Sequence, residues 1–172
     1  MTDPSSDAAL AQARRETRAA FENRALMYYH IYSVLQEEFG RDRAVELMKR
    51  AIHRRGLEVG AKYEAAGTSG DLQEVGRIFC EGSPCEGELF HPAVEELEDG
   101  RIVLSMQTCP LVDAWRAQGL SDDEIDVLCD VSNAVDEGTF ERAGLELVFL
   151  ERLAAPEQSR CVLELRVPRD AG

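Results

Sequence analysis

The stretch Val94-Glu-Glu-Leu-Glu-Asp-Gly-Arg-Ile-Val-Leu-Ser-Met-Gln-Thr-Cys-Pro110 decides the fold of this chain. Two strand-like runs, residues 94–97 and 102–106, flank an Asp-Gly pair, which favours the primed turns that match strand twist. This predicts an antiparallel hairpin. Proline fixes its own φ and lacks an N–H, so the chain leaves the second strand sharply at Cys109-Pro110 and can begin a helix there.

Two helices are predicted before this hairpin. Apolar residues recur at steps of three and four over residues 10–39, which indicates one long amphipathic helix, and Gly40 follows as a C-cap. A second helix is expected over residues 42–63, where Gly56 and Gly60 could allow a kink or a close helix crossing. Because the break at Gly40 is short, the two helices should form an antiparallel hairpin.

Two more helices and a second strand pair are predicted after the hairpin. Residues 111–118 form the first helix, and Ser121-Asp-Asp-Glu124 is a capping box that opens the second, which Gly138 closes. Residues 145–153 and 161–167 read as strands. The fold class is therefore α+β, with an N-terminal helical hairpin packed on a small antiparallel sheet of about four strands and two further helices.

The length of 172 residues suits a single domain. We expect residues 1–172 to form that domain, with residues 1–20 as the part of the first helix that could fray. Residues 21–66 would be the helical hairpin and residues 67–172 the mixed α/β part. The Gly- and Ser-containing stretch 66–71 marks the boundary between them.

Composition indicates a globular protein of the cytoplasm. Apolar residues make up 44 % of the chain and charged residues 30 %. No apolar run approaches the roughly 20 residues of a membrane span, and the first residues lack a signal-peptide pattern. No membrane partner is expected. In a reducing compartment the five cysteines would be thiols or metal ligands.

The net charge of −14 is unevenly distributed and argues against a nucleic-acid partner. Residues 1–66 carry 11 Lys and Arg against 10 Asp and Glu, whereas residues 67–172 carry 8 against 23. The one basic cluster lies on the second helix. It would be a solvated helix face or a face docked on the acidic remainder, and consists of Lys49, Arg50, Arg54 and Arg55.

Three cysteines each have a reason to point inward. Cys109 ends a strand, Cys129 lies on the apolar face of a helix and Cys161 begins the last strand. If they converge, they form a thiol pocket able to hold a metal ion or an electrophilic substrate; otherwise they are ordinary buried cysteines. Cys109 would lie near a helix amino terminus, where partial positive charge lowers a thiol pKa.

Other residues could contribute to a site. Cys80 and Cys85 form a Cys-x₄-Cys pair in residues 80–88, which are expected to be an irregular loop. The pair is half of a zinc site at most, and His91 lies close to it in the sequence. The acidic half of the chain would repel an anionic ligand unless an inward arginine offsets it. Arg116 and Arg142 are candidates by position, and Arg24 by its place on the first helix.

The segments around the three cysteines resemble the L-2-amino-thiazoline-4-carboxylate hydrolase family. They are Gln107-Thr-Cys-Pro-Leu-Val112, Leu128-Cys-Asp-Val-Ser-Asn-Ala-Val-Asp-Glu-Gly138 and Ser159-Arg-Cys-Val-Leu163, and the resemblance extends from about Phe21. It implies opening of a small cyclic thiazoline by water, on a route that releases cysteine. The outline is also similar to vinyl-reductase-type sensor domains, which can bind zinc through cysteines.

One position departs from the family pattern. Where the family tends to have Asp, three residues after the helical cysteine, this chain has Ser132. We expect Asp130 and Asp136 to point away from Ser132 on the helix, so that neither replaces that carboxylate. Ring opening requires a base to activate water, so the departure puts the hydrolase activity in question.

Two functions therefore stand beside each other. In the first, the protein is a hydrolase of small cyclic C–N or C–S compounds: Cys109 acts as nucleophile or ligand, Cys129 lines the pocket, and Asp130 or His91 supplies acid–base help. Arg24, His91, Arg116, Ser132 and Cys161 would bind the ligand, without a cofactor. In the second, it is a non-catalytic sensor-like module that binds a small molecule, or zinc through Cys109, Cys129 and Cys161. The long first helix, with Tyr29 off its main stripe, could serve a homodimer.

Overall fold

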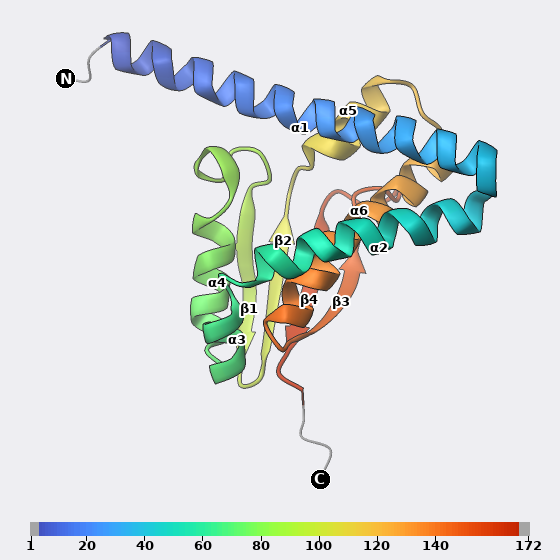
Figure 1. Ribbon diagram of the computed structural model, residues 1–172. Helices are drawn as coiled ribbons and strands as arrows, with labels where there is room; N and C mark the ends of the chain where they lie inside the picture. The colour runs from blue at the N-terminus through green and yellow to red at the C-terminus, as the bar shows by residue number, and fades with distance from the viewer. Residues whose placement is uncertain (1–3, 169–172) are drawn as a thin grey trace.

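The computed structural model describes residues 4–168, which form six α-helices, a 3₁₀ turn and four strands (Figure 1). In chain order these are α1 (Pro4–Phe39), α2 (Arg41–Gly60), α3 (Glu64–Ser69), α4 (Leu72–Glu81), η1 (Pro84–Gly87), β1 (Pro92–Glu98), β2 (Arg101–Met106), α5 (Pro110–Ala117), α6 (Asp122–Arg142), β3 (Glu146–Glu151) and β4 (Cys161–Arg166). Residues 4–20 of the segment expected to fray are helical, and residues 1–3 lie outside the described residues.

The sheet is antiparallel throughout and has the strand order β1-β2-β4-β3. The predicted hairpin is confirmed: Gly100 turns the chain with a φ of 74°, and Val94 pairs with Leu104. In the next ladder Met106 pairs with Cys161, so β4 begins where β2 ends. The α+β class and the four-stranded antiparallel sheet are therefore as predicted.

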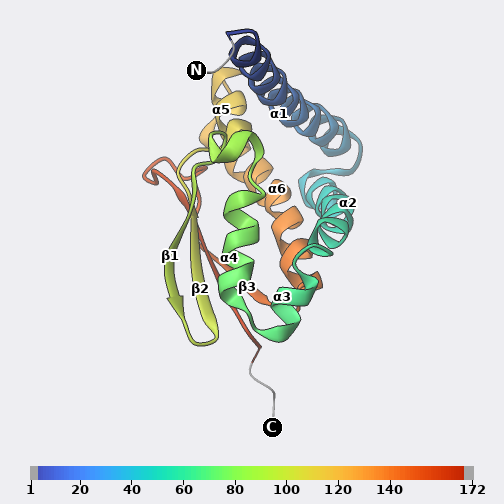
Figure 2. The same cartoon turned by 90° about the vertical axis from the view of Figure 1, so that its left-hand side faces the viewer.

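The molecule is layered on one face of this sheet. Figure 2 shows α4 and α6 against the sheet, with α2 on the far side of α6 and α1 beyond the end of the layer, next to α5. The hairpin of α1 and α2 thus reaches the sheet through α6. The indole Nε1 of Trp115 in α5 donates to the carbonyl of Ala25 at 2.9 Å and fixes α1 at this end.

The two longest core helices, α2 and α6, touch backbone to backbone. A Cβ added at Gly56 would lie 2.3 Å from the carbonyl oxygen of Val135, and one at Gly138 would lie 2.3 Å from the carbonyl oxygen of His53. The Thr139 hydroxyl adds a hydrogen bond of 3.3 Å to the carbonyl of Gly56. The close crossing predicted from Gly56 is confirmed, because only a residue without a Cβ allows this approach.

Three predicted boundaries are wrong. Gly138 does not close its helix, since α6 continues to Arg142 and uses the glycine for the crossing with α2. The second helix ends at Gly60 rather than at Tyr63, and α3 follows as a separate helix. Cys80 belongs to α4 rather than to the loop that follows.

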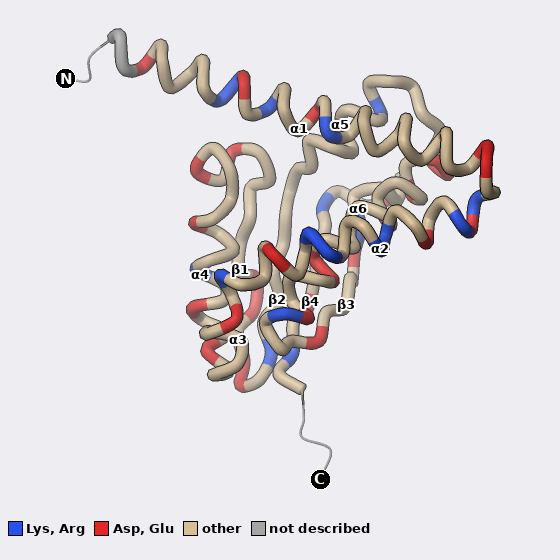
Figure 3. The backbone as a smooth tube through the Cα atoms, viewed as in Figure 1, with Lys and Arg blue, Asp and Glu red and all other residues tan. Residues whose placement is uncertain are grey.

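Charges lie unevenly over these layers (Figure 3). The basic cluster of α2 docks in part on the acidic remainder: Lys49 lies 3.3 Å from the Asp130 carboxylate and 3.2 Å from that of Glu137, and His53 lies 2.8 Å from that of Glu141. Acidic residues of α6 thereby occupy part of this basic face. Over residues 4–168, no helix combines the length and the apolarity that crossing a bilayer demands.

We predict that Gly138→Ala lowers the free energy of unfolding by about 2 kcal/mol, because an added methyl group forces two backbones apart. In an open helix position the same change would stabilise by about 1 kcal/mol. Urea denaturation measures the difference, with Ala51→Gly on the exposed face of α2 as a control that changes helix propensity alone. A Gly138→Ala variant as stable as the wild type would contradict the close contact between the backbones of α2 and α6.

Candidate functional site

A partly enclosed cavity of about 470 Å³ lies between α2, α5, α6 and the ends of β2 and β4. Its walls also take residues from α1, from α4 and from the segment that follows α4. Aromatic rings form a large part of the lining, namely Phe21, Tyr63, Phe79, Phe90 and Phe140. Such a concave, mostly apolar space with a few polar groups is the usual form of a small-molecule site.

The three cysteines singled out from the sequence all line this cavity. Cys109 is the N-cap of α5, Cys129 is buried on α6 and Cys161 is buried at the start of β4. The backbone N–H of Leu153 donates to the Cys161 sulfur at 3.2 Å. Three segments far apart in the chain therefore place a thiol on one wall.

Burial makes these thiols weak acids. It raises the pKa of Cys109 to about 11, although the N–H groups of Val112 and Leu111 at the start of α5 act in the opposite direction. Burial, with the neighbouring Cys161 and Cys109, raises the pKa of Cys129 to about 12. The prediction that a helix amino terminus lowers the pKa of Cys109 is thus wrong in its net effect, because desolvation outweighs the helix contribution. At neutral pH these two side chains are uncharged thiols.

Asp136 is the acidic residue of the cavity wall. Burial, followed by the nearby charge of Glu137, raises its pKa to about 7, while Arg24 acts in the opposite direction. No hydrogen bond from residues 4–168 reaches its carboxylate. The chain therefore holds a titratable carboxyl, with free acceptor and donor capacity, against an apolar space.

The prediction that Asp136 points away from Ser132 is wrong. The two residues are four positions apart, which is little more than one helical turn, so they share a face of α6. Both line the cavity. The Ser132 hydroxyl donates to the carbonyl of Cys129 at 2.9 Å and so is turned back on its own helix. A carboxylate is present on this wall after all, one turn further along than the family pattern places it.

The remaining predicted site residues divide between the cavity and the surface. Arg24 lines the cavity, with its guanidinium 4.2 Å from the centre of the Phe21 ring. Asp130 lies on the outside of α6, paired with Lys49. Arg116 is exposed and donates to the carbonyl of Leu153 at 2.7 Å.

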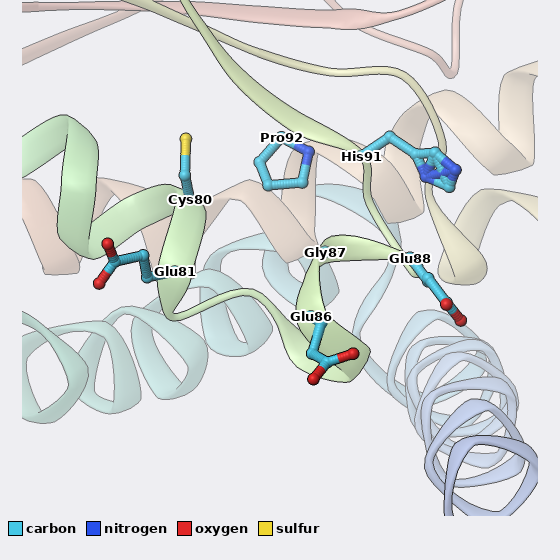
Figure 4. A pocket seen from close by; sticks show the side chains of 7 residues that line it. All are labelled: Cys80, Glu81, Glu86, Gly87, Glu88, His91 and Pro92. Carbon is cyan, nitrogen blue, oxygen red and sulfur yellow. The ribbon is translucent and has the colours of Figure 1, made fainter. Parts of the chain in front are cut away.

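His91 lies at a second hollow, an open cleft of about 630 Å³ outside the segment after α4 (Figure 4). Its labelled side chains point in different directions and do not converge on one point; they are Cys80, Glu81, Glu86, Glu88, Pro92 and His91. Cys85, the partner of Cys80 in the predicted half site, does not line this cleft. Within the described part of the chain, no three His, Cys, Asp or Glu side chains are placed to hold a metal ion.

Sequence reasoning named Cys129 and Ser132 for the site but missed Asn133 and Thr139 and misplaced Asp136. The signal was present as a helical period: Cys129, Ser132, Asn133, Asp136 and Thr139 follow one another at steps of three, one, three and three, and all five line the cavity. Tyr63 also faces the cavity, and burial together with the charge of Asp136 raises its pKa.

Comparison with known proteins gives one sequence family and a shared fold. The sequence model of the L-2-amino-thiazoline-4-carboxylic acid hydrolase family matches residues 18–155. No curated protein sequence matches the chain. Among solved structures, the chain is similar to a trafficking protein particle complex subunit 3 from Naegleria fowleri covalently bound to palmitic acid, at a TM-score of 0.56 and 11 % identity. That match covers 88 % of this chain and 96 % of the other, and it establishes a common fold.

The raised pKa of Asp136 predicts a dependence of stability on pH. The folded protein binds a proton that the unfolded chain releases between about pH 4 and pH 7, so this group makes stability fall as pH rises through that window. Three pKa units correspond to at most about 4 kcal/mol. Asp136→Asn should remove the fall and exceed the wild type in stability above pH 7. Urea denaturation across pH, with Asp130→Asn as the matched control on the same helix, decides this; parallel curves for wild type and Asp136→Asn would refute it.

Proposed function

The chain belongs to the L-2-amino-thiazoline-4-carboxylic acid hydrolase family, and on this premise we propose that it hydrolyses small cyclic C–N or C–S compounds inside the cavity. The proposal is carried by one observation: a single carboxyl, Asp136, faces the cavity with a pKa raised to about 7. A general acid–base group works best when its pKa is near the ambient pH, because both protonation states are then populated.

Asp136 takes the role first assigned to Asp130. In its ionised form it removes a proton from a water molecule that attacks the ring carbon bonded to both heteroatoms. The protonated carboxyl gives this proton to the ring nitrogen as the C=N double bond becomes single. The carboxylate then removes the proton of the added hydroxyl, which becomes a carbonyl as a ring bond from that carbon breaks, and returns it to the departing nitrogen or sulfur. One water is consumed, and the carboxylate is restored, without a metal or another cofactor being required for the proton balance.

The other residues of the cavity wall support this chemistry: one cation is placed near Asp136, and the thiols are uncharged. Arg24 is the cation whose charge acts on Asp136, and it is placed to bind a substrate carboxylate. The uncharged thiols of Cys109, Cys129 and Cys161 provide a soft apolar surface for the ring. A pKa of about 11 leaves Cys109 almost wholly protonated at neutral pH, which favours this lining role over that of a nucleophile.

We predict that the purified protein opens 2-amino-thiazoline-4-carboxylate and that Asp136→Asn lowers kcat/KM by at least about 100-fold, the usual contribution of a positioned acid–base group. Asp130→Asn, a loss of the same charge outside the cavity, should stay within about threefold. Cys109→Ala should retain most of the activity. Chromatographic detection of the ring-opened product measures all three. Wild-type protein without turnover, or an Asp136→Asn variant of unchanged activity, would refute the proposed reaction.

A second candidate function is non-catalytic binding of an apolar ligand such as an acyl chain. The cavity of about 470 Å³ has room for roughly 16 water molecules, more than a single five-membered ring displaces. The aromatic and thiol surfaces of its wall suit a hydrocarbon. The structure of similar fold is covalently bound to palmitic acid.

For this candidate we predict that palmitate binds the protein by calorimetry and that Ser132→Phe, which fills part of the cavity, weakens binding at least tenfold. Val34→Phe, an equal aromatic addition at an exposed position of α1, should leave the affinity unchanged. Equal affinities in the two variants would place palmitate outside the cavity. Binding without any ring-opening activity would favour this candidate over the hydrolase.

A further inference from the structure

The segment between α4 and β1, residues 82–91, is a thin wall between two hollows. On its inner side Ser83, Pro84 and Phe90 line the cavity. On its outer side Gly87 and Glu88 line the open cleft of Figure 4. Pro92, at the start of β1, lines both spaces, so the segment that leads into it forms part of the wall between them.

The backbone of this segment is held in an unfavourable conformation. Cys85 and Glu86 have φ values of 56° and 57°, and His91 has 48°, although none of them is glycine. The left-handed region costs energy for residues with a Cβ and persists only where surrounding contacts enforce it. Gly82 and Gly87 flank the strained pair and can absorb a change in backbone direction.

One side chain from a distant helix supplies the enforcing contact. Arg14 of α1 lies 2.6 Å from the Glu86 carboxylate and 2.6 Å from that of Glu88. Figure 3 shows this acidic loop beneath the basic stretch of α1, which extends beyond the rest of the molecule. Both carboxylates are largely exposed, at 80 % and 52 %, so water and salt compete for them.

The two ends of the segment are anchored differently. The carbonyl of Phe90 accepts from the N–H groups of Gln107 at 2.9 Å and Thr108 at 3.2 Å, and its ring packs edge-on against Phe21. Residues 83–88 have no comparable attachment to the sheet. Because Phe90 is held by these contacts, residues 83–88 are the part of the segment that can move.

The observed arrangement of the segment also leaves polar atoms without partners. Within the described residues, the Nε of Arg14 and the hydroxyl of Ser83 are buried without a hydrogen bond. Burial of an unpaired polar group is unfavourable. Both atoms belong to the contact or to the segment itself, so opening would return them to water.

We propose that residues 83–88 are a gate of the cavity and that Arg14 is its latch. When the latch holds, Pro84 and its neighbours separate the cavity from the outer cleft; when it releases, the left-handed residues relax and the two spaces join. Arg14 lies before residues 18–155, the part matched by the family model, so the match itself does not include the latch. The gate serves a substrate or a non-catalytic ligand equally.

The rate at which the cavity thiols react with a reagent measures how often the gate opens, and no ligand is needed for this experiment. We expect N-ethylmaleimide to label Cys109, Cys129 and Cys161 about fivefold faster in Arg14→Ala than in the wild type, since two partly exposed ion pairs are lost. Arg15→Ala is the matched control, because Arg15 is a neighbouring arginine of α1 that bonds Gln12 alone among the described residues. Mass spectrometry of the separate cysteine peptides gives each rate, and circular dichroism confirms that the variants are folded.

A second variant should act in the opposite direction. Cys85→Asn replaces the strained residue by one that tolerates the left-handed region. The latched state then becomes more stable relative to the released one, and labelling of the cavity thiols slows. High salt should accelerate labelling of the wild type and leave Arg14→Ala unchanged. Equal rates in wild type, Arg14→Ala and Arg15→Ala would overturn the proposal, as would faster labelling in Cys85→Asn.

Discussion

The contact between the backbones of α2 and α6 is the constraint on which the site depends. Gly56 and Gly138 let the helices meet without side chains between them, and the crossing fixes how α6 is rotated about its axis. That rotation turns one face of α6 toward the cavity and another face toward Lys49. Asp136 and Asp130, six residues apart on one helix, consequently lie in opposite environments. A shift of this crossing would move both walls of the cavity.

Desolvation is the electrostatic force that sets the character of the cavity. It raises the pKa of the thiols far enough to keep them neutral, and it raises that of Asp136 only to about 7. The same physical cause therefore gives an inert apolar wall and a carboxyl that can exchange a proton near neutrality. A hydrolase needs the carboxyl, whereas a binding module needs only the wall. The cavity as folded provides both, and the gate proposed at residues 83–88 would control access in either case.

Local signals in the sequence were sufficient for most elements. The Asp-Gly turn, the capping box at Ser121 and Glu124, and the cysteine before Pro110 each predicted a feature that the structure contains. The role of Gly138 was predicted wrongly because a glycine late in a helix can be either a C-cap or a contact between helices. The neighbouring sequence does not distinguish these two roles. Asp136 was expected to point away from Ser132, although a separation of four residues is little more than one helical turn and places both on the same face.

Turn chemistry, caps and apolar periodicity act between residues close in the chain, so the amino-acid order alone was enough to predict the α+β class, the succession of helices and strands, and three inward-facing cysteines. Three features required the folded chain: the set of polar groups that share the cavity, the dominance of burial over the helix terminus at Cys109, and the contact of Arg14 with Glu86. Burial and long-range contact depend on how distant elements pack, and packing brings together residues that no local pattern connects.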